Sequence, residues 1–363
     1  MPSRRTILAG LLAARGGVLN AAPTTDAPAI DVATRAPLRF PRDFGAHPET
    51  RTEWWYVTGA LAAGSRLWGF QITFFRVPTG VTGADASRFA ARELVFAHAA
   101  VSDLEARRLR HDQRIARTGF AIAEAAVSDT DLVVGDWRLT RERGGGYRAR
   151  AASGSAGFAF DLALTPTQPL LLQGAGGVSR KGPRPGQTSR YYSEPQLAAR
   201  GTLAVEGRSI DVAGRAWLDH EWSDAYLDPN AAGWDWIGMN LDDGSALMAF
   251  RIRRGDGSTV WTGGSFRAKD GATRDFADGE VVFTPGRTWT SPASSARYPV
   301  EWQVATPAGR FQVRALLDDQ ELDSRVSTGA IYWEGLSLLE DVRGTRLGRG
   351  YLEMTGYASR LVL

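Results

Sequence analysis

Two segments decide how the chain is interpreted: A-W-L-D-H-E-W-S at residues 216–223 and G-W-D-W-I-G-M-N-L-D-D-G at residues 233–244. These segments hold four of the twelve tryptophans and one of the four histidines. Apolar and polar residues alternate in both, which is typical of a β-strand that separates two surroundings. We therefore expect two strands, joined by an irregular connection at residues 224–232 that we interpret as a domain boundary.

The alternation assigns the side chains of each strand to two faces. One face carries a polar residue among large apolar ones, in the sets Leu218, His220 and Trp222, and Asp235, Ile237, Met239 and Leu241. The other face carries Trp217, Asp219 and Glu221 in the first strand, and Trp234 and Trp236 in the second. Burial would lower the pKa of His220 and raise that of Asp235 unless a partner compensates. A structural role, as a bonded core histidine and a turn cap, is an equal alternative.

Length and composition indicate an ordinary globular protein. The chain has 363 residues, more than one typical core, so two domains are expected. Lys and Arg exceed Asp and Glu by only three, and no basic stripe is present, so the pI near 9.3 does not indicate nucleic-acid binding. The absence of cysteine excludes disulfides, thiolate catalysis and cysteine-ligated zinc.

The N-terminus carries a possible export signal. Residues 3–14, S-R-R-T-I-L-A-G-L-L-A-A, place a twin arginine before a short apolar run. We expect a periplasmic or secreted protein in which residues 1–37 form the signal and a linker. Arg15 cuts the apolar run short, so a cytoplasmic location is the alternative. No later run reaches the ~20 apolar residues of a spanning helix, so no transmembrane segment is expected in the body.

The rest of the chain predicts an all-β fold. Short segments of aromatic and β-branched residues, separated by Gly, Pro and Asp turns, recur from Glu53 to Tyr357. This favours antiparallel barrels or sandwiches over an alternating α/β fold. Only residues 103–118, which are charged and weakly periodic, are expected to form a short helix or a long loop.

Familiar catalytic and cofactor signatures are missing. The sequence has no G-x-S-x-G elbow, H-E-x-x-H motif, phosphate loop or dinucleotide fingerprint, and we expect no cofactor. The four histidines, His47, His98, His111 and His220, are far apart in the sequence. A metal site would need them to converge over long range, so no metal is expected.

Six motifs occur in a recognisable order: E-W-W-Y at 53–56, F-A-H-A-A at 96–100, W-L-D-H-E-W-S at 217–223, G-W-D-W at 233–236, Y-W-E-G at 332–335 and G-R-G-Y-L-E-M-T-G-Y at 348–357. With them, the chain resembles the carotenoid 1,2-hydratase and AttH-like family, often labelled secreted hydrolases. The resemblance implies two tandem lipocalin-like antiparallel β-barrel domains, residues 38–226 and 227–363. The candidate site then lies at their junction, a frequent place for ligand sites.

The resemblance also implies site residues. In the hydratases, activity is attributed to a histidine and a tryptophan spaced as H-x-W, which match His220 and Trp222, and to a downstream acid, for which Asp235 is the nearest candidate. The hydratases have an aromatic residue two positions before that acid, whereas this chain has Gly233. The substrate-binding candidates, drawn from the same motifs, are Trp55, His98, Glu221, Trp234 and Trp236.

The expected function is acid-catalysed addition of water to a C=C bond of a hydrophobic, isoprenoid or lipid-like small molecule. This reaction needs a neutral acid to protonate carbon, support for a cation, and a placed water. A carboxyl group held neutral by burial supplies the acid, and tryptophan faces stabilise a cation by about 2 kcal/mol when desolvated.

Two other functions stay open. The first alternative is a non-catalytic, lipocalin-type carrier of an apolar ligand, because a fold does not fix a function. The second alternative, ranked third after the hydratase and the carrier, is a secreted hydrolase. Ser193 and Ser223 lie near the candidate site, but neither has a base at a diagnostic spacing. The sequence leaves the oligomeric state open.

The export signal gives a test. Replacing Arg4 and Arg5 together by lysine should keep the protein in the cytoplasm, because the exporter reads the arginine pair as an address. Cell fractionation and immunoblotting of both forms measure this. Unchanged export of the double variant would exclude the twin-arginine route, and a cytoplasmic unmodified chain would exclude export.

Overall fold

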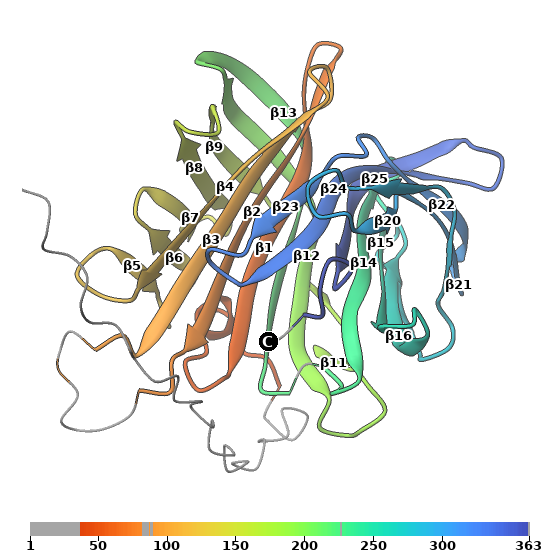
Figure 1. The fold of residues 1–363 in the computed structure, drawn as a ribbon, viewed down its shortest axis with the longest axis horizontal. Helices are drawn as coiled ribbons and strands as arrows, with labels where there is room; N and C mark the ends of the chain where they lie inside the picture. Colours follow the sequence, from red (N-terminus) through yellow and green to blue (C-terminus); the bar gives the residue numbers. More distant parts are fainter. Residues whose placement is uncertain (1–36, 82–86, 88–89, 226, 362–363) are drawn as a thin grey trace, which may run out of the picture.

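The computed structural model describes residues 37–361 except 82–86, 88–89 and 226. The described residues form strands almost throughout and contain no α-helix; a 3-10 turn, η2 (Arg42–Phe44), precedes the first strand (Figure 1). The all-β prediction is confirmed. Apart from Pro37, the expected export signal and linker lie outside the described residues. No helix in the described part of the chain is long and apolar enough to cross a membrane.

The first sheet, sheet A, has thirteen strands: β1 (Thr52–Ala63), β2 (Arg66–Pro78), β3 (Glu93–Asp103), β4 (Arg108–Arg117), β5 (Ala123–Ala125), β6 (Asp131–Val134), β7 (Trp137–Arg141), β8 (Tyr147–Ser153), β9 (Phe158–Thr165), β10 (Leu171–Leu172), β11 (Val178–Arg180), β12 (Thr188–Val205) and β13 (Arg208–Ser223). Its order is β4-β3-β2-β1-β13-β12-β9-β8-β7-β6-β5, all antiparallel. Because β5 and β6 lie against β3 and β4, the sheet forms a nearly closed barrel around its own core.

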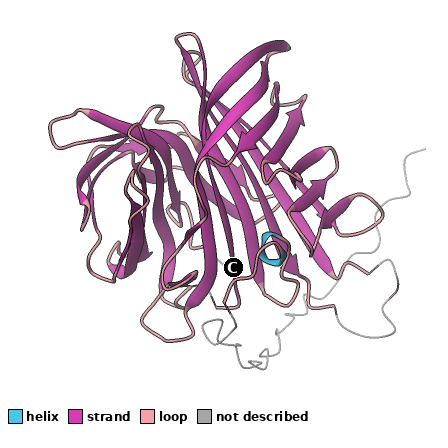
Figure 2. Ribbon diagram, turned by 180° about the vertical axis from the view of Figure 1, so that it is seen from behind, coloured by secondary structure: helices cyan, strands magenta, loops and turns pink. Residues whose placement is uncertain are grey.

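The second sheet, sheet B, has ten strands: β14 (Ala231–Leu241), β15 (Ala246–Arg254), β16 (Thr259–Arg267), β17 (Thr273–Phe276), β18 (Val282–Pro285), β21 (Glu301–Thr306), β22 (Gly309–Ala315), β23 (Glu321–Ser324), β24 (Ala330–Glu340) and β25 (Arg346–Thr355). Two short strands, β19 (Thr288–Thr290) and β20 (Arg297–Pro299), form a separate pair. Sheet B is curled (Figure 2). It encloses a second core that includes Ile237, Trp302 and Trp333. The connection between β13 and β14 contains the expected domain boundary.

Residues 103–118 do not form the expected helix or long loop. A tight turn at residues 104–107 leads into β4, which pairs with β3 from Leu94↔Arg117 to Asp103↔Arg108. The sequence pattern is weak because β4 is the last strand of the sheet order and little of it is fully buried. Charged side chains are tolerated on such an edge strand and discourage pairing with another chain.

The outer face of sheet A packs against sheet B, so the two sheets share one interface. A third apolar cluster joins them, with Tyr56, Tyr191 and Trp217 from sheet A and Trp236 and Tyr351 from sheet B. Gly69 of β2 allows the close approach, because a β-carbon there would lie 2.6 Å from the Tyr351 hydroxyl and 2.9 Å from Leu336 Cβ. A side chain at this position would push the sheets apart.

The contact at Gly69 gives a stability test. Gly69→Ala should destabilise the protein by about 1–3 kcal/mol, because overpacking forces neighbours from their preferred positions. Thermal unfolding followed by circular dichroism measures the change. The matched control is Gly255→Ala, where an added β-carbon meets nothing within 4 Å. A Gly69→Ala variant as stable as this control would contradict the described packing of the two sheets.

Candidate active site

The D-H-E-W segment divides its side chains between the two faces of β13. Trp222 belongs to the sheet A core, and the ring of His220 stacks on Trp55 of that core with centroids 4.3 Å apart. Asp219 and Glu221 point the other way and line a cavity between the sheets. The alternation expected from the sequence therefore separates the acids of this motif from its histidine.

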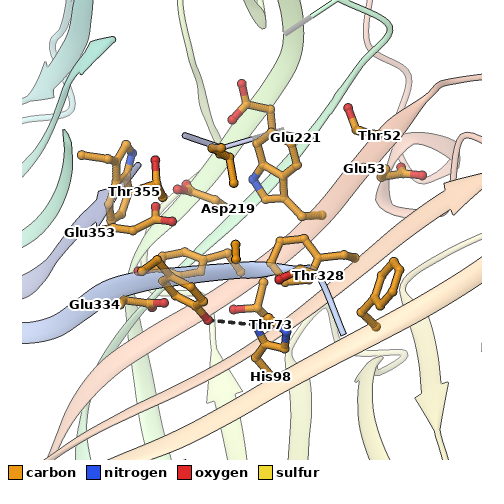
Figure 3. Close-up of a pocket in the computed structure, with 18 of the residues that line it drawn as sticks. Thr52, Glu53, Thr73, His98, Asp219, Glu221, Thr328, Glu334, Glu353 and Thr355 are labelled. Carbon is orange, nitrogen blue, oxygen red and sulfur yellow. Dashed lines mark hydrogen bonds between the residues drawn. The ribbon is translucent and has the colours of Figure 1, made fainter. Parts of the chain in front are cut away.

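The cavity has a volume of about 270 Å³. Figure 3 shows side chains that line it. Sheet A lines it with two rows of side chains that lie in register across β13, β1, β2 and β3: Asp219, Tyr56, Thr73 and His98, and Glu221, Trp54, Phe75 and Phe96. Sheet B lines it with Trp236, Glu353 and Glu334, in register across β14, β25 and β24, and with Trp234 and Tyr332. Glu53 also belongs to the lining, so several aromatic rings and five acidic residues surround one small space.

Asp219 is a buried acid held by several donors. It accepts hydrogen bonds from Ser193 Oγ at 2.5 Å, from Tyr191 OH at 2.7 Å and from Trp217 Nε1 at 2.7 Å. Burial raises its pKa to about 7, although these bonds act in the opposite direction. The carboxyl group therefore changes its protonation near neutral pH.

Glu353 and Glu334 are register partners on adjacent strands of sheet B. Glu353 accepts a hydrogen bond from Trp234 Nε1 at 3.1 Å. Burial raises its pKa to about 7, and the nearby charges of Asp219 and Glu221 add to the increase. Burial also raises the pKa of Glu334 well above its usual value, and the charge of Glu353 contributes. At neutral pH this pair retains at least one proton.

Glu221 differs from Asp219, Glu334 and Glu353 because a neighbouring cation balances its negative charge. Lys181, which follows β11, places its ammonium 2.8 Å from Glu221 Oε1, and Ser189 donates to the same carboxylate. Burial raises the pKa of Glu221, while Lys181 acts to lower it. The segment at residues 173–189, which contains β11, is therefore anchored at Glu221 beside the cavity.

His98 connects the sheets at the other side of the cavity. Its Nδ1 lies 2.8 Å from the Tyr332 hydroxyl and its Nε2 lies 2.9 Å from Ser327 Oγ. Ser327 Oγ donates to Gln113 at 2.5 Å, so it accepts the hydrogen of His98 Nε2. Burial lowers the pKa of His98 to about 3, which keeps the ring neutral.

Thr73 contributes a polar group without a partner. It lies between Tyr56 and His98 in the register of sheet A and is almost completely buried. Its hydroxyl makes no hydrogen bond to any part of the chain that the structure describes. Because buried polar groups are normally hydrogen-bonded, this hydroxyl is available to a bound water or ligand.

His220 belongs to a charge network inside sheet A. Oε1 of Glu53 accepts from His220 Nε2 at 2.9 Å and from His47 Nδ1 at 2.7 Å, while Arg76 Nε lies 2.8 Å from Oε2. Despite burial, the histidine hydrogen bonds hold the pKa of Glu53 well below its usual range. The convergence of His47, Glu53 and His220 was not expected from the sequence. Their side-chain nitrogen and oxygen atoms lie within 4.8 Å of one another, and both histidines are hydrogen-bonded to Glu53.

Asp235 lies in the core of sheet B, away from His220. Arg251 donates to its Oδ2 through Nε at 3.0 Å and Nη2 at 2.6 Å, and Tyr357 donates to its Oδ1 at 2.8 Å. The structure does not bring His220 and Asp235 together, as their expected joint action would require. Each points into the core of its own sheet, and these cores lie on opposite sides of the interface.

Four of the eight residues expected at the site line the cavity: His98, Glu221, Trp234 and Trp236. The other four, Trp55, His220, Trp222 and Asp235, do not. Sequence reasoning missed the acids Asp219, Glu334 and Glu353. A sequence pattern could have identified these three acids: each is a single acid among aromatic and apolar residues, in W-L-D-H, Y-W-E-G and Y-L-E-M.

Comparisons with known proteins agree with this architecture. A crystal structure of an AttH candidate from Nitrosomonas europaea is 49% identical and has a TM-score of 0.84, covering 90% of this chain and 99% of its own. Kievitone hydratase from Nectria haematococca has a TM-score of 0.68 at 15% identity, covering 91% of this chain and 96% of its own, which shows a shared fold. No curated protein matches. Since the family profile described as AttH-like matches residues 31–357, the chain belongs to the AttH-like family.

Proposed function

We propose that the protein adds water to a C=C bond of a hydrophobic small molecule, and that the reaction takes place in the cavity between the sheets. The observation that carries this proposal is a set of buried carboxyl groups that hold protons near neutral pH and face aromatic rings. A neutral acid in an apolar cavity is what protonation of carbon requires. The shared fold with a protein named as a hydratase is compatible with such a reaction.

Glu353 is the best candidate for the proton donor. Its pKa of about 7 balances acid strength against the protonated fraction at neutral pH. Asp219 has a similar pKa, but three donors occupy its oxygens, which favours a supporting role. Glu334, on the next strand, keeps its proton and limits the negative charge of the pair.

The remaining steps use the walls of the cavity. Transfer of the Glu353 proton to one alkene carbon leaves a carbocation on the other. The faces of Trp234 and Trp236 stabilise such a cation by about 2 kcal/mol when water is excluded. A water held by the Thr73 hydroxyl attacks the cation and returns a proton to the Glu353 carboxylate, which restores the acid.

A hydrolase is less well supported, although Ser327 and His98 form a contact that resembles a nucleophile and its base. The hydroxyl of Tyr332, rather than a carboxylate, contacts the other ring nitrogen of His98. With a pKa of about 3, His98 is too weak a base to activate a serine hydroxyl near neutral pH. A non-catalytic carrier needs only the apolar cavity and is the remaining alternative.

The acid assignment predicts a specific loss of turnover. With geraniol as a small acyclic isoprenoid probe, Glu353→Gln should lower the hydration rate by about a hundredfold, because the amide keeps the shape but cannot donate that proton. In the unmodified protein the rate should fall as the pH rises through about 7, where Glu353 loses its proton. Gas chromatography of the product measures both.

Glu124→Gln, an exposed acid on β5, serves as the matched control and should leave the rate unchanged. Full activity in a folded Glu353→Gln variant would exclude this residue as the donor. Binding of geraniol without turnover under any condition would favour the carrier.

The position of the cavity gives a second prediction. A fluorescent polyene probe should quench tryptophan emission, and Trp236→Leu should weaken its binding about tenfold or more, since the ring of Trp236 lines the cavity. Trp222→Leu should leave the affinity unchanged, because Trp222 lies inside sheet A. Equal loss of affinity in both variants, with the fold intact by circular dichroism, would place the ligand elsewhere.

A further inference from the structure

We propose that the cavity binds a protonated organic amine with an apolar substituent, with the ammonium group held among Asp219, Glu334 and Glu353 and the substituent against the surrounding aromatic rings. This inference rests on the proposed function in one respect: an ammonium ion resembles the cation that proton transfer would create at the same carboxyl groups. Its test does not require turnover.

The balance of charge in the cavity favours a cation. Five acids of the two sheets line the site: Glu53, Asp219, Glu221, Glu334 and Glu353. Glu53 is already paired with Arg76 and bonded to two histidines. Lys181 pairs with Glu221, whereas Asp219, Glu334 and Glu353 lie more than 4 Å from any Lys or Arg nitrogen in the part of the chain that the structure describes. Figure 3 shows Asp219, Glu334 and Glu353 at one end of the pocket. A positive ligand there would gain from the ionised members of this group, without competition from a nearby Lys or Arg among the described residues.

Lys181 already shows how this interface holds an ammonium group. Its nitrogen lies 2.8 Å from Glu221 Oε1, 4.3 Å from the ring centroid of Phe250 and 4.8 Å from that of Tyr191. A carboxylate and aromatic faces around one ammonium are the elements by which proteins recognise organic cations. The facing wall of the cavity offers the same elements, the carboxyl group of Glu353 with the rings of Trp234 and Trp236.

The Thr73 hydroxyl is an independent sign of a polar ligand. It is buried at the cavity wall and lacks a hydrogen-bond partner among the described residues. An ammonium N–H can donate to this oxygen as well as to a carboxylate. We therefore infer a primary, secondary or tertiary ammonium rather than a quaternary one, which has no N–H.

Binding should depend on pH in a defined direction. The ionisable groups that face the cavity are Glu53, Tyr56, His98, Tyr191, Asp219 and Glu221 from sheet A, Lys181 after β11, and Tyr332, Glu334 and Glu353 from sheet B. Asp219 and Glu353 have pKa values of about 7 without ligand, so an ammonium must displace their protons below that pH. Affinity therefore rises as the pH rises through about 7, while an alkylammonium, with an ordinary pKa of about 10.4, stays charged.

Titration calorimetry of the full chain with hexylamine and its neutral analogue 1-hexanol tests this. At pH 8, hexylammonium should bind at least about tenfold more tightly than hexanol, which corresponds to a shift of one unit in one carboxyl pKa. Its affinity should fall by about tenfold at pH 6. The measured heat should depend on the ionisation enthalpy of the buffer, because binding releases protons.

Variants locate the site. Glu353→Gln should weaken hexylammonium binding and flatten its pH dependence, and leave hexanol binding unchanged. Thr73→Val, which replaces the hydroxyl by a methyl group of similar size, should weaken hexylammonium binding to a smaller extent. Glu124→Gln on β5 is the matched control and should change neither. Should Glu353→Gln fail to fold, the pH dependence of the unmodified protein still decides the question.

Equal affinity for hexylamine and hexanol, or an affinity for hexylamine that ignores pH, would overturn the inference. Geraniol hydration with no ammonium binding would overturn it and leave the proposed function standing. Ammonium binding at this site without any hydration would support the inference and overturn the catalytic proposal.

Discussion

The packing of the outer face of sheet A against sheet B is the contact on which the site depends. Neither sheet could bury the acids on its outer face alone, because those faces would meet water. When Tyr56, Tyr191 and Trp236 close around the interface, the carboxyl groups of Asp219 and Glu353 are removed from solvent as well. Their unusual protonation is a consequence of how the two sheets meet.

Burying several acids in one place opposes folding, and the structure limits that cost in different ways. Lys181 neutralises Glu221 by an ion pair, whereas Asp219 is solvated by donors from Ser193, Tyr191 and Trp217. Glu353 accepts a hydrogen bond from Trp234, and the pair of Glu353 and Glu334 is stabilised by keeping a proton, as expected for carboxyl groups that cannot all ionise together. Functional sites often contain such groups, because chemistry needs pKa values near the working pH.

The polar networks around Glu53 in sheet A and around Asp235 in sheet B differ from the group of acids in the cavity. Glu53 is matched by Arg76 and the histidines, and Asp235 by Arg251 and Tyr357, so each charge is compensated where it is buried. Removing one partner of such a network leaves an uncompensated charge and destabilises the fold. His220, whose identity suggested catalysis, therefore belongs with the groups that hold strand β1 to β13 at the edge of the site.

The sequence by itself determined the all-β fold and the alternation of W-L-D-H-E-W, because the period of a strand fixes which residues share a face. It also placed Glu221, Trp234 and Trp236 on faces that meet at the cavity. It could not tell which face of each strand turns toward the other sheet, so His220 and Asp235 were assigned to a common site that they do not form. Only the tertiary structure brought Glu334 and Glu353 to Asp219, more than 100 residues away in the chain. It also buried Lys181 and left the Thr73 hydroxyl without a partner among the described residues, since these relations depend on packing between sheets.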